Sequence, residues 1–187
     1  MVNAETPLAR IALPAMLLGA LAPALIPATV PAASGARPRA GSTVSARALS
    51  ASRELWATIN VCNAPDQPDT VGIRGSMPGD GQAHDTLYMR FRLQYLNTSS
   101  QHWVDLADAA TGFVAVGSAK AARQGGGSFQ LVPVAGRPAF TLRGVVNFQW
   151  RRGASVLTAV SRATSAGRQS LAGADPAGFS AATCQIG

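Results

Sequence analysis

Side chains that could carry out catalysis are scarce in this 187-residue chain, which has nine acidic residues, two histidines and two cysteines. Glu54 is the only glutamate after residue 5, which excludes the pair of glutamates that many glycosidases use. No serine lies in a G-x-S-x-G setting, and no P-loop, dinucleotide fingerprint or HExxH motif is present. His84 and His102 are the only candidate general bases, and we interpret both as exposed loop residues. An unrecognised hydrolase is therefore the least favoured function.

Lysine is almost absent, with one lysine against 15 arginines, yet the formal net charge is +7. Four of the arginines, and no acidic residue, lie in residues 34–53, whereas residues 54–187 hold 11 basic and 8 acidic residues. The part of the chain that we expect to fold is thus only mildly basic. Together with the export signal described next, this charge distribution argues against a nucleic-acid partner.

The first 33 residues have the three regions of a secretory signal peptide. Arg10 precedes an uncharged apolar run over 11–30, which small residues around Ala32 and Ala33 follow. The alternative is an uncleaved membrane anchor, because twenty apolar residues can span a bilayer; three prolines interrupt the run. We expect cleavage near Ala33 and a secreted or cell-envelope protein, in contact with the membrane only if the leader is retained. Residues 34–53, SGARPRAGSTVSARALSASR, are predicted to be a flexible linker.

Cysteine occurs only at Cys62 and Cys184. An even number of cysteines in an exported chain predicts a disulfide. The bond would tether the C-terminal tail to the first strand of the domain. There is no CxxC spacing, so a redox pair or a thiolate metal site is disfavoured.

Helical periodicity is missing from every segment of ten or more residues, and alternation with a period of two takes its place. The strongest alternation covers 139–164, where one parity is apolar and the other largely polar. The parity predicted to face the core comprises Phe140, Leu142, Gly144, Val146, Phe148 and Trp150. A turn at 151–153 then leads into a hairpin partner over 155–162.

Shorter strands are predicted before this hairpin, over 54–62, 70–77, 86–96, 102–106, 112–117 and 128–134. Within 86–96, the residues that we expect to face the core are Leu87, Met89, Phe91, Leu93 and Tyr95. Residues 118–127, which include three consecutive glycines, are predicted to be a flexible loop. Turn residues every 8–12 positions between short strands indicate an all-β antiparallel sandwich of about seven or eight strands, over residues 54–187.

Two stretches carry a resemblance to immunoglobulin-like and fibronectin type III domains. RFRLQYLNTSSQHWVDL (90–106) resembles their C–C′ hairpin, and SFQLVPVAGRPAFTLRGVVNFQW (128–150) resembles their E–F unit. With the tail GFSAATCQI, the chain is also similar to small secreted proteins of high-GC Gram-positive bacteria that have no assigned role. The cysteines, on the first strand and the tail, depart from the immunoglobulin pattern. The resemblance implies a fold and carries no activity.

In such domains strands C and F are neighbours, so their outward side chains would form one surface. Guanidinium groups and amides beside aromatic rings suit anionic glycans, cell-wall polymers or an acidic protein. A solvated outer face is the alternative, and Trp103 could either stack on sugars or cap the edge of the core. The candidate binding surface comprises Tyr88, Arg90, Arg92, Gln94, Trp103, Arg143, Asn147 and Gln149.

A calcium site is a weaker possibility. If successive strands run up and down, the loops that precede and follow the C–C′ hairpin would bring four carboxylates, which are ligands that calcium prefers, to one end. They belong to Asp80, Asp85, Asp105 and Asp108. Aspartate is also common in turns for local reasons, and we expect no cofactor. The sequence thus favours a secreted, non-catalytic binding or adhesion module, with a structural or accessory ectodomain as the alternative.

Overall fold

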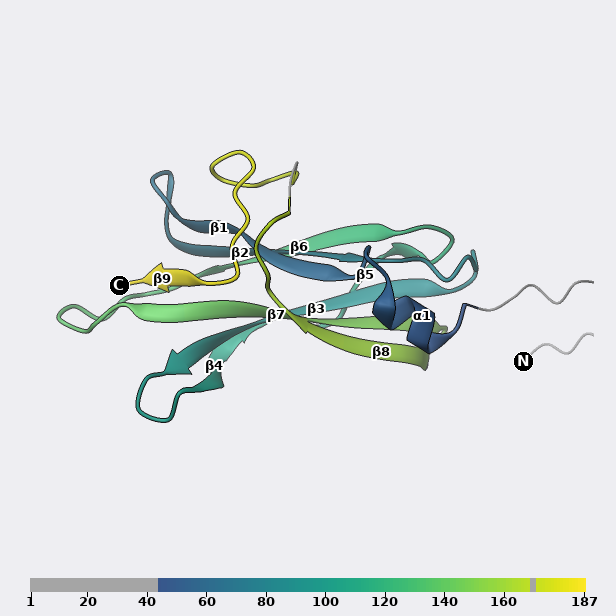
Figure 1. Ribbon diagram of the computed structural model, residues 1–187, viewed down its shortest axis with the longest axis horizontal. Helices are drawn as coiled ribbons and strands as arrows, with labels where there is room; N and C mark the ends of the chain where they lie inside the picture. Colours follow the sequence, from purple (N-terminus) through teal and green to yellow (C-terminus); the bar gives the residue numbers. More distant parts are fainter. Residues whose placement is uncertain (1–43, 169–170) are drawn as a thin grey trace, which may run out of the picture. The chain divides into compact units, whose positions relative to one another are not determined.

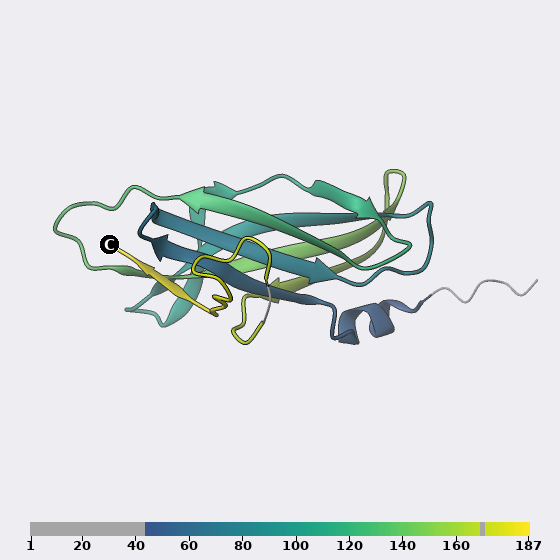
Figure 2. The same ribbon diagram turned by 90° about the horizontal axis from the view of Figure 1, so that it is seen from above.

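Two antiparallel β-sheets pack face to face in this protein (Figures 1 and 2). The structure is a computed structural model that describes residues 44–168 and 171–187. The expected signal peptide, 1–33, lies outside the described residues. Over the part that is described, the chain forms nine strands and one short helix, so the prediction of an all-β sandwich is confirmed.

The smaller sheet has the strand order β1-β2-β6. Its strands are β1 (Trp56–Ala64), β2 (Gln67–Met77) and β6 (Arg123–Gln130). The larger sheet has the order β4-β3-β7-β8, with β5 beside β3 and β9 beside β7. Its strands are β3 (Thr86–Asn97), β4 (His102–Ala110), β5 (Val114–Ser118), β7 (Phe140–Arg152), β8 (Ser155–Ala163) and β9 (Cys184–Ile186).

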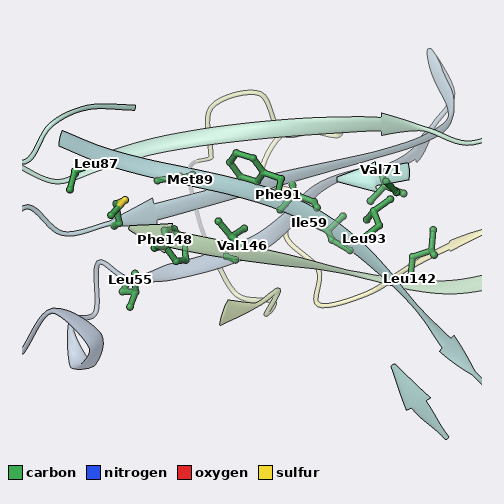
Figure 3. Packing of buried hydrophobic residues seen from close by; sticks show 14 of the residues in the cluster. Leu55, Ile59, Val71, Leu87, Met89, Phe91, Leu93, Leu142, Val146 and Phe148 are labelled. Carbon is green, nitrogen blue, oxygen red and sulfur yellow. The ribbon is translucent and has the colours of Figure 1, made fainter. Parts of the chain in front are cut away.

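The pairing of β3 with β7 is regular over ten residue pairs, from Thr86 opposite Arg151 to Tyr95 opposite Leu142. Side chains of one parity on both strands point between the sheets, as Figure 3 shows for Phe91 and Phe148. Removal of these side chains from water is the main favourable contribution to folding. Those that are fully buried include Leu87, Met89, Leu93, Leu142, Val146, Phe148 and Trp150. The Trp150 indole N–H donates to the Pro78 carbonyl at 2.9 Å, so burial leaves no unpaired donor on this ring.

The glycine-rich stretch expected to be a flexible loop is instead part of β6, and that prediction is wrong for Arg123–Gly127. Gly125 and Gly127 face the opposite sheet. A β-carbon would lie 2.9 Å from a Val116 methyl group at Gly125, and 3.1 Å from the Phe91 ring at Gly127. Real β-carbons essentially never approach as closely as 2.9 Å, and 3.1 Å would force the Phe91 ring to shift, so glycine at both positions lets β6 lie against the larger sheet.

The end of β6 and the start of β7 also differ from the prediction. The strand expected over 128–134 ends at Gln130. Phe140, which alternation places in the core, is 43% exposed. It lies at the first position of β7, and its ring contacts Tyr95 edge to face, with the ring centres 6.4 Å apart. Alternation predicts the direction of a side chain, but at the end of a strand there is less of the opposite sheet to cover it.

Part of the expected linker is helical. Helix α1 (Ala46–Ala51) begins after Ser45, whose hydroxyl accepts from the Ala48 N–H at 3.2 Å as an N-cap. Leu49 is buried in the core cluster, and this burial stabilises a helix too short to persist alone. The prediction of an unstructured spacer is therefore wrong for Ala46–Ala51, whereas residues 34–43 lie outside the described part.

The C-terminal segment closes the outer edge of β1. Ile59 and Ala181 exchange two backbone hydrogen bonds, and the Asp175 N–H donates to the Asn60 carbonyl at 2.8 Å. The Asn60 side chain donates to the Gly173 carbonyl. Thr58 and Asn60 point away from the core side of β1, and they are buried because the C-terminal segment packs over them.

The predicted disulfide is confirmed, since Cys62 on β1 is bonded to Cys184 on β9. The bond joins the two sheets, because β1 lies in the smaller sheet and β9 pairs with β7 in the larger one. It also holds the covering tail in place.

We expect that replacing both cysteines, in a C62S/C184S variant, will destabilise the domain. The bond closes a loop across 122 residues, and a closed loop of about 100 residues is worth about 4.7 kcal/mol in the chain-entropy description. Urea unfolding of the oxidised protein and of the variant would measure the loss. Equal free energies of unfolding would show that the tail does not need the bond as a tether.

Candidate functional site

The regular pairing of β3 and β7 brings residues of the candidate binding surface opposite one another. Tyr88 lies opposite Gln149, Arg90 opposite Asn147, and Gln94 opposite Arg143. All of them are partly exposed on the face that points away from the smaller sheet. The expectation that these two strands are neighbours is confirmed, and it assembles side chains about fifty residues apart in the chain.

A continuous hydrogen-bonded network crosses this face. The Arg143 Nε donates to the Gln94 Oε1 at 2.8 Å, and the Gln94 Nε2 donates to the Asp105 Oδ1 at 2.8 Å. Arg92 forms an ion pair with the other oxygen of Asp105 and donates to the Asn147 Oδ1 at 3.1 Å. Each of these long side chains is fixed by a neighbour, which lowers the entropy that would be lost on binding a ligand.

Aromatic rings hold two of the arginines. The guanidinium carbon of Arg143 lies 4.4 Å from the centre of the Trp103 ring. That of Arg151 lies 4.3 Å from the Tyr88 ring and 4.8 Å from the Phe113 ring. These are cation–π distances. Because Arg143 already lies over the Trp103 ring, the face that it covers is closed to a sugar.

Arg151 and Phe113 also belong to this face, although neither is among the residues expected there from the sequence. Arg151 continues the outward parity of Asn147 and Gln149 by one more step, but the pair Arg151-Arg152 before a glycine was interpreted as a turn. Counting the alternation to the end of the strand would have found it. Phe113 lies between β4 and β5, in an irregular segment that no periodicity describes.

Four arginines lie on this face: Arg90, Arg92, Arg143 and Arg151. Arg90 makes the fewest contacts with other side chains. Its Nε donates to the Thr111 carbonyl at 3.1 Å, the one hydrogen bond that this side chain makes among the described residues. Arg90 lines an open groove of about 660 Å³ together with Arg92, Asp105, Asn147, Gln149, Ser161 and apolar side chains such as Phe113 and Val160. Four guanidinium groups and one carboxylate, that of Asp105, give this face an excess of positive charge. Burial lowers the pKa of Arg143, but an arginine remains charged at neutral pH.

The four aspartates considered as calcium ligands do not assemble into one site. Asp105 and Asp108 lie within β4, which runs on to Ala110, whereas the sequence analysis placed them at or beyond the end of a shorter strand. Asp105 is paired with Arg92, on the outer face of the larger sheet. Throughout residues 44–168 and 171–187, no group of three or more His, Cys, Asp or Glu side chains is arranged to hold a metal ion.

Asp80 and Asp85 do lie together, in the connection between β2 and β3. Asp85 is 1% exposed and accepts from Arg152 twice, at 2.7 and 3.0 Å. These bonds lower the pKa of Asp85, whereas burial, with a hydrogen bond to Asp85, raises the pKa of Asp80. The Asp80 Oδ1 accepts from the Gln82 N–H at 2.8 Å. The pair is an internal anchor of this connection.

The two histidines are exposed, as expected. The His84 Nε2 lies 3.4 Å from the Asp85 Oδ1, and His102 begins β4. Both cysteines are in the disulfide and cannot act as nucleophiles. Within the described part of the chain, none of the helices is both long and apolar enough to span a bilayer.

No protein-family model matches the chain, and no curated protein is significantly similar to it.

We expect Asp85→Asn and Asp80→Asn to change stability in opposite directions near pH 7. Asp85 has a lowered pKa, so its stabilisation is present above the unfolded value of about 3.9 and is lost as the pH falls through the folded pKa. Asp80 has a raised pKa, so its ionisation costs stability as the pH rises above about 3.9. Asparagine at position 80 removes that cost and can still accept from Gln82.

Urea unfolding at about pH 7 and about pH 3 would measure both effects. At the higher pH, D85N should unfold at lower urea than the wild type and D80N at higher urea. Both differences should shrink at the lower pH. Equal destabilisation by the two variants would contradict the assignment of opposite roles.

Proposed function

We propose that this protein is a secreted, non-catalytic immunoglobulin-like module that binds an anionic polymer at the cell envelope through the outer face of β3 and β7. The proposal of an immunoglobulin-like fold is supported by the distribution of the strands. Immunoglobulin domains hold strands A, B and E in one sheet and C, F and G in the other. Strands β1, β2 and β6 occupy the first set of places, and β3, β7 and β8 the second.

Export is supported by the amino-terminal pattern and by the disulfide, which is characteristic of proteins that fold outside the cytoplasm. The ligand class is supported by one observation above all. Arg90 lies at a wide groove with its terminal amino groups uncommitted, beside a network that holds Arg92, Asn147 and Gln94 in place. Carboxylate, sulfate and phosphate groups accept such donors in charge-assisted hydrogen bonds.

The groove is open to solvent, and guanidinium groups, amides, a hydroxyl and the Asp105 carboxylate line it beside apolar side chains such as Phe113 and Val160. Such a mixed, open groove suits an extended polymer better than a small apolar ligand. Many weak polar contacts along a chain would supply the affinity. The alternative proposal is a structural or accessory ectodomain that presents the same face to an acidic partner protein. The two proposals share their residues and differ in the ligand.

We expect Arg90→Ala to weaken binding of polygalacturonate, dextran sulfate or polyphosphate by about tenfold, which is the loss of one hydrogen bond to a charged group. Arg123→Ala is the matched control. Arg123 is exposed, and its Nε makes one contact to a backbone carbonyl, that of Ser118 at 3.4 Å. Titration calorimetry at low and high salt would measure both variants, with binding weaker at high salt.

Three outcomes separate the possibilities. Equal losses in the two variants would mean that net charge, and not this groove, attracts the polymer. Binding to polyglutamate, with none to the glycans, would favour the acidic protein partner. No binding to any of these polyanions would contradict the proposed ligand class.

A further inference from the structure

The connection between β6 and β7, LVPVAGRPA over residues 131–139, has one polar side chain, that of Arg137. Surface connections normally carry polar residues, because apolar ones gain nothing from exposure to water. We define the apolar tip as residues 131–140, which adds Phe140 at the start of β7. The apolar tip contains no residue of the candidate binding surface on β3 and β7.

Two of the ten residues of the apolar tip pack against the domain, and the other eight are exposed. Leu131 and Pro133 are partly buried and line an apolar cavity of about 120 Å³ with Leu142 and Ile186. Val132 and Phe140 lie at the same cavity but remain exposed. The exposed large apolar side chains of the tip are Val132 at 91%, Val134 at 61% and Phe140 at 43%. Packing therefore explains Leu131 and Pro133 and, through Tyr95, part of Phe140. It leaves most of the surface of Val132 and Val134 in water.

The apolar tip has a defined shape. The Leu131 N–H donates to the Asp69 carbonyl at 2.9 Å, which fixes the base of the loop. The Arg137 N–H donates to the Val134 carbonyl at 3.1 Å across a turn in which Gly136 has φ +78°. Figures 1 and 2 show the loop projecting at the end of the sandwich, farther out than the neighbouring β1–β2 and β3–β4 turns.

We infer that the apolar tip inserts into the interface of a lipid bilayer that carries anionic headgroups. Val132, Val134 and Phe140 would leave water for the boundary of the acyl chains, and Arg137, the one charge of the loop, would remain among the phosphates. Two acidic residues lie at this end. Asp66 belongs to the β1–β2 turn, which Figure 1 shows to end short of the tip, and Asp69 lies in β2 at the base of the loop.

A lipid surface suits this shape better than a protein partner does. A stable protein interface needs about 800 Å² of complementary surface on each side. A single projecting loop with three separated side chains offers little flat area. A fluid interface adapts to a convex tip and needs no shape complementarity.

The test uses the full chain with Val134→Cys carrying an environment-sensitive NBD fluorophore. The native cysteines are bonded to each other, so only the new thiol is labelled. Vesicles of equal parts phosphatidylglycerol and phosphatidylcholine should shift the emission to the blue. A label at Ala154→Cys, in the β7–β8 turn at the other end of β7, should not shift. Residues 1–43 are the same in both proteins.

Unlabelled variants measure the contribution of each group to vesicle partitioning. V132S/V134S should weaken it at least tenfold, whereas V156S/L157S, at apolar side chains of β8 with 49% and 46% exposure, should not. Arg137→Ala should weaken it about fivefold for vesicles with phosphatidylglycerol, and Arg123→Ala should have no effect.

An unshifted label at position 134, or an equal shift at positions 134 and 154, would overturn the inference. A protein that covers the tip would also leave the label unshifted with vesicles alone. The inference does not depend on the proposed polymer site, because the tip contains none of the residues of that site. The two ideas can therefore fail separately.

Discussion

The register of β3 against β7 is the constraint on which the rest of the structure depends. A strand pair that slips by one residue turns every side chain to the other face. In the observed register Met89 faces Phe148 inside the sandwich, and Arg90 faces Asn147 outside it. The core and the candidate binding face are thus two results of one pairing. Apolar burial fixes the register, and the register then determines which polar groups meet on the outer face.

Two further features complete the sandwich around this pair. Gly125 and Gly127 remove the side chains that would hold β6 away from Phe91 and Val116. The C-terminal tail, tied down by Cys184, supplies hydrogen-bond partners to the open edge of β1. An unprotected edge invites pairing with other chains, and here the tail occupies it. The candidate binding surface therefore lies on a sandwich that is stabilised in two ways. Glycines in β6 allow the two sheets to pack closely, and the Cys62–Cys184 disulfide joins them covalently.

The sequence was most informative where periodicity applies. Alternation correctly predicted Leu87 to Leu93 and Leu142 to Trp150 as core, and an even cysteine number predicted the disulfide. It failed where the deciding contact is tertiary. Three consecutive glycines at 125–127 predict a flexible loop, but close packing of the first and third against Phe91 and Val116 makes this stretch part of a strand. Helix α1 is too short to be stable by helix propensity alone, and the burial of Leu49 stabilises it. Within the site, alternation assembled seven of the eight candidate side chains on β3 and β7. It could not show that Arg143 covers Trp103, that Asp105 belongs with Arg92 and not with a metal, or that Arg151 extends the face.

Backbone nuclear Overhauser contacts between β3 and β7 test this account most directly. The observed register predicts cross-strand contacts that join Tyr88 with Gln149, Arg90 with Asn147, and Gln94 with Arg143. A pattern shifted by one residue, with Arg90 opposite Val146 or Phe148, would turn the arginines toward the core. That result would contradict both the fold and the binding face derived from it.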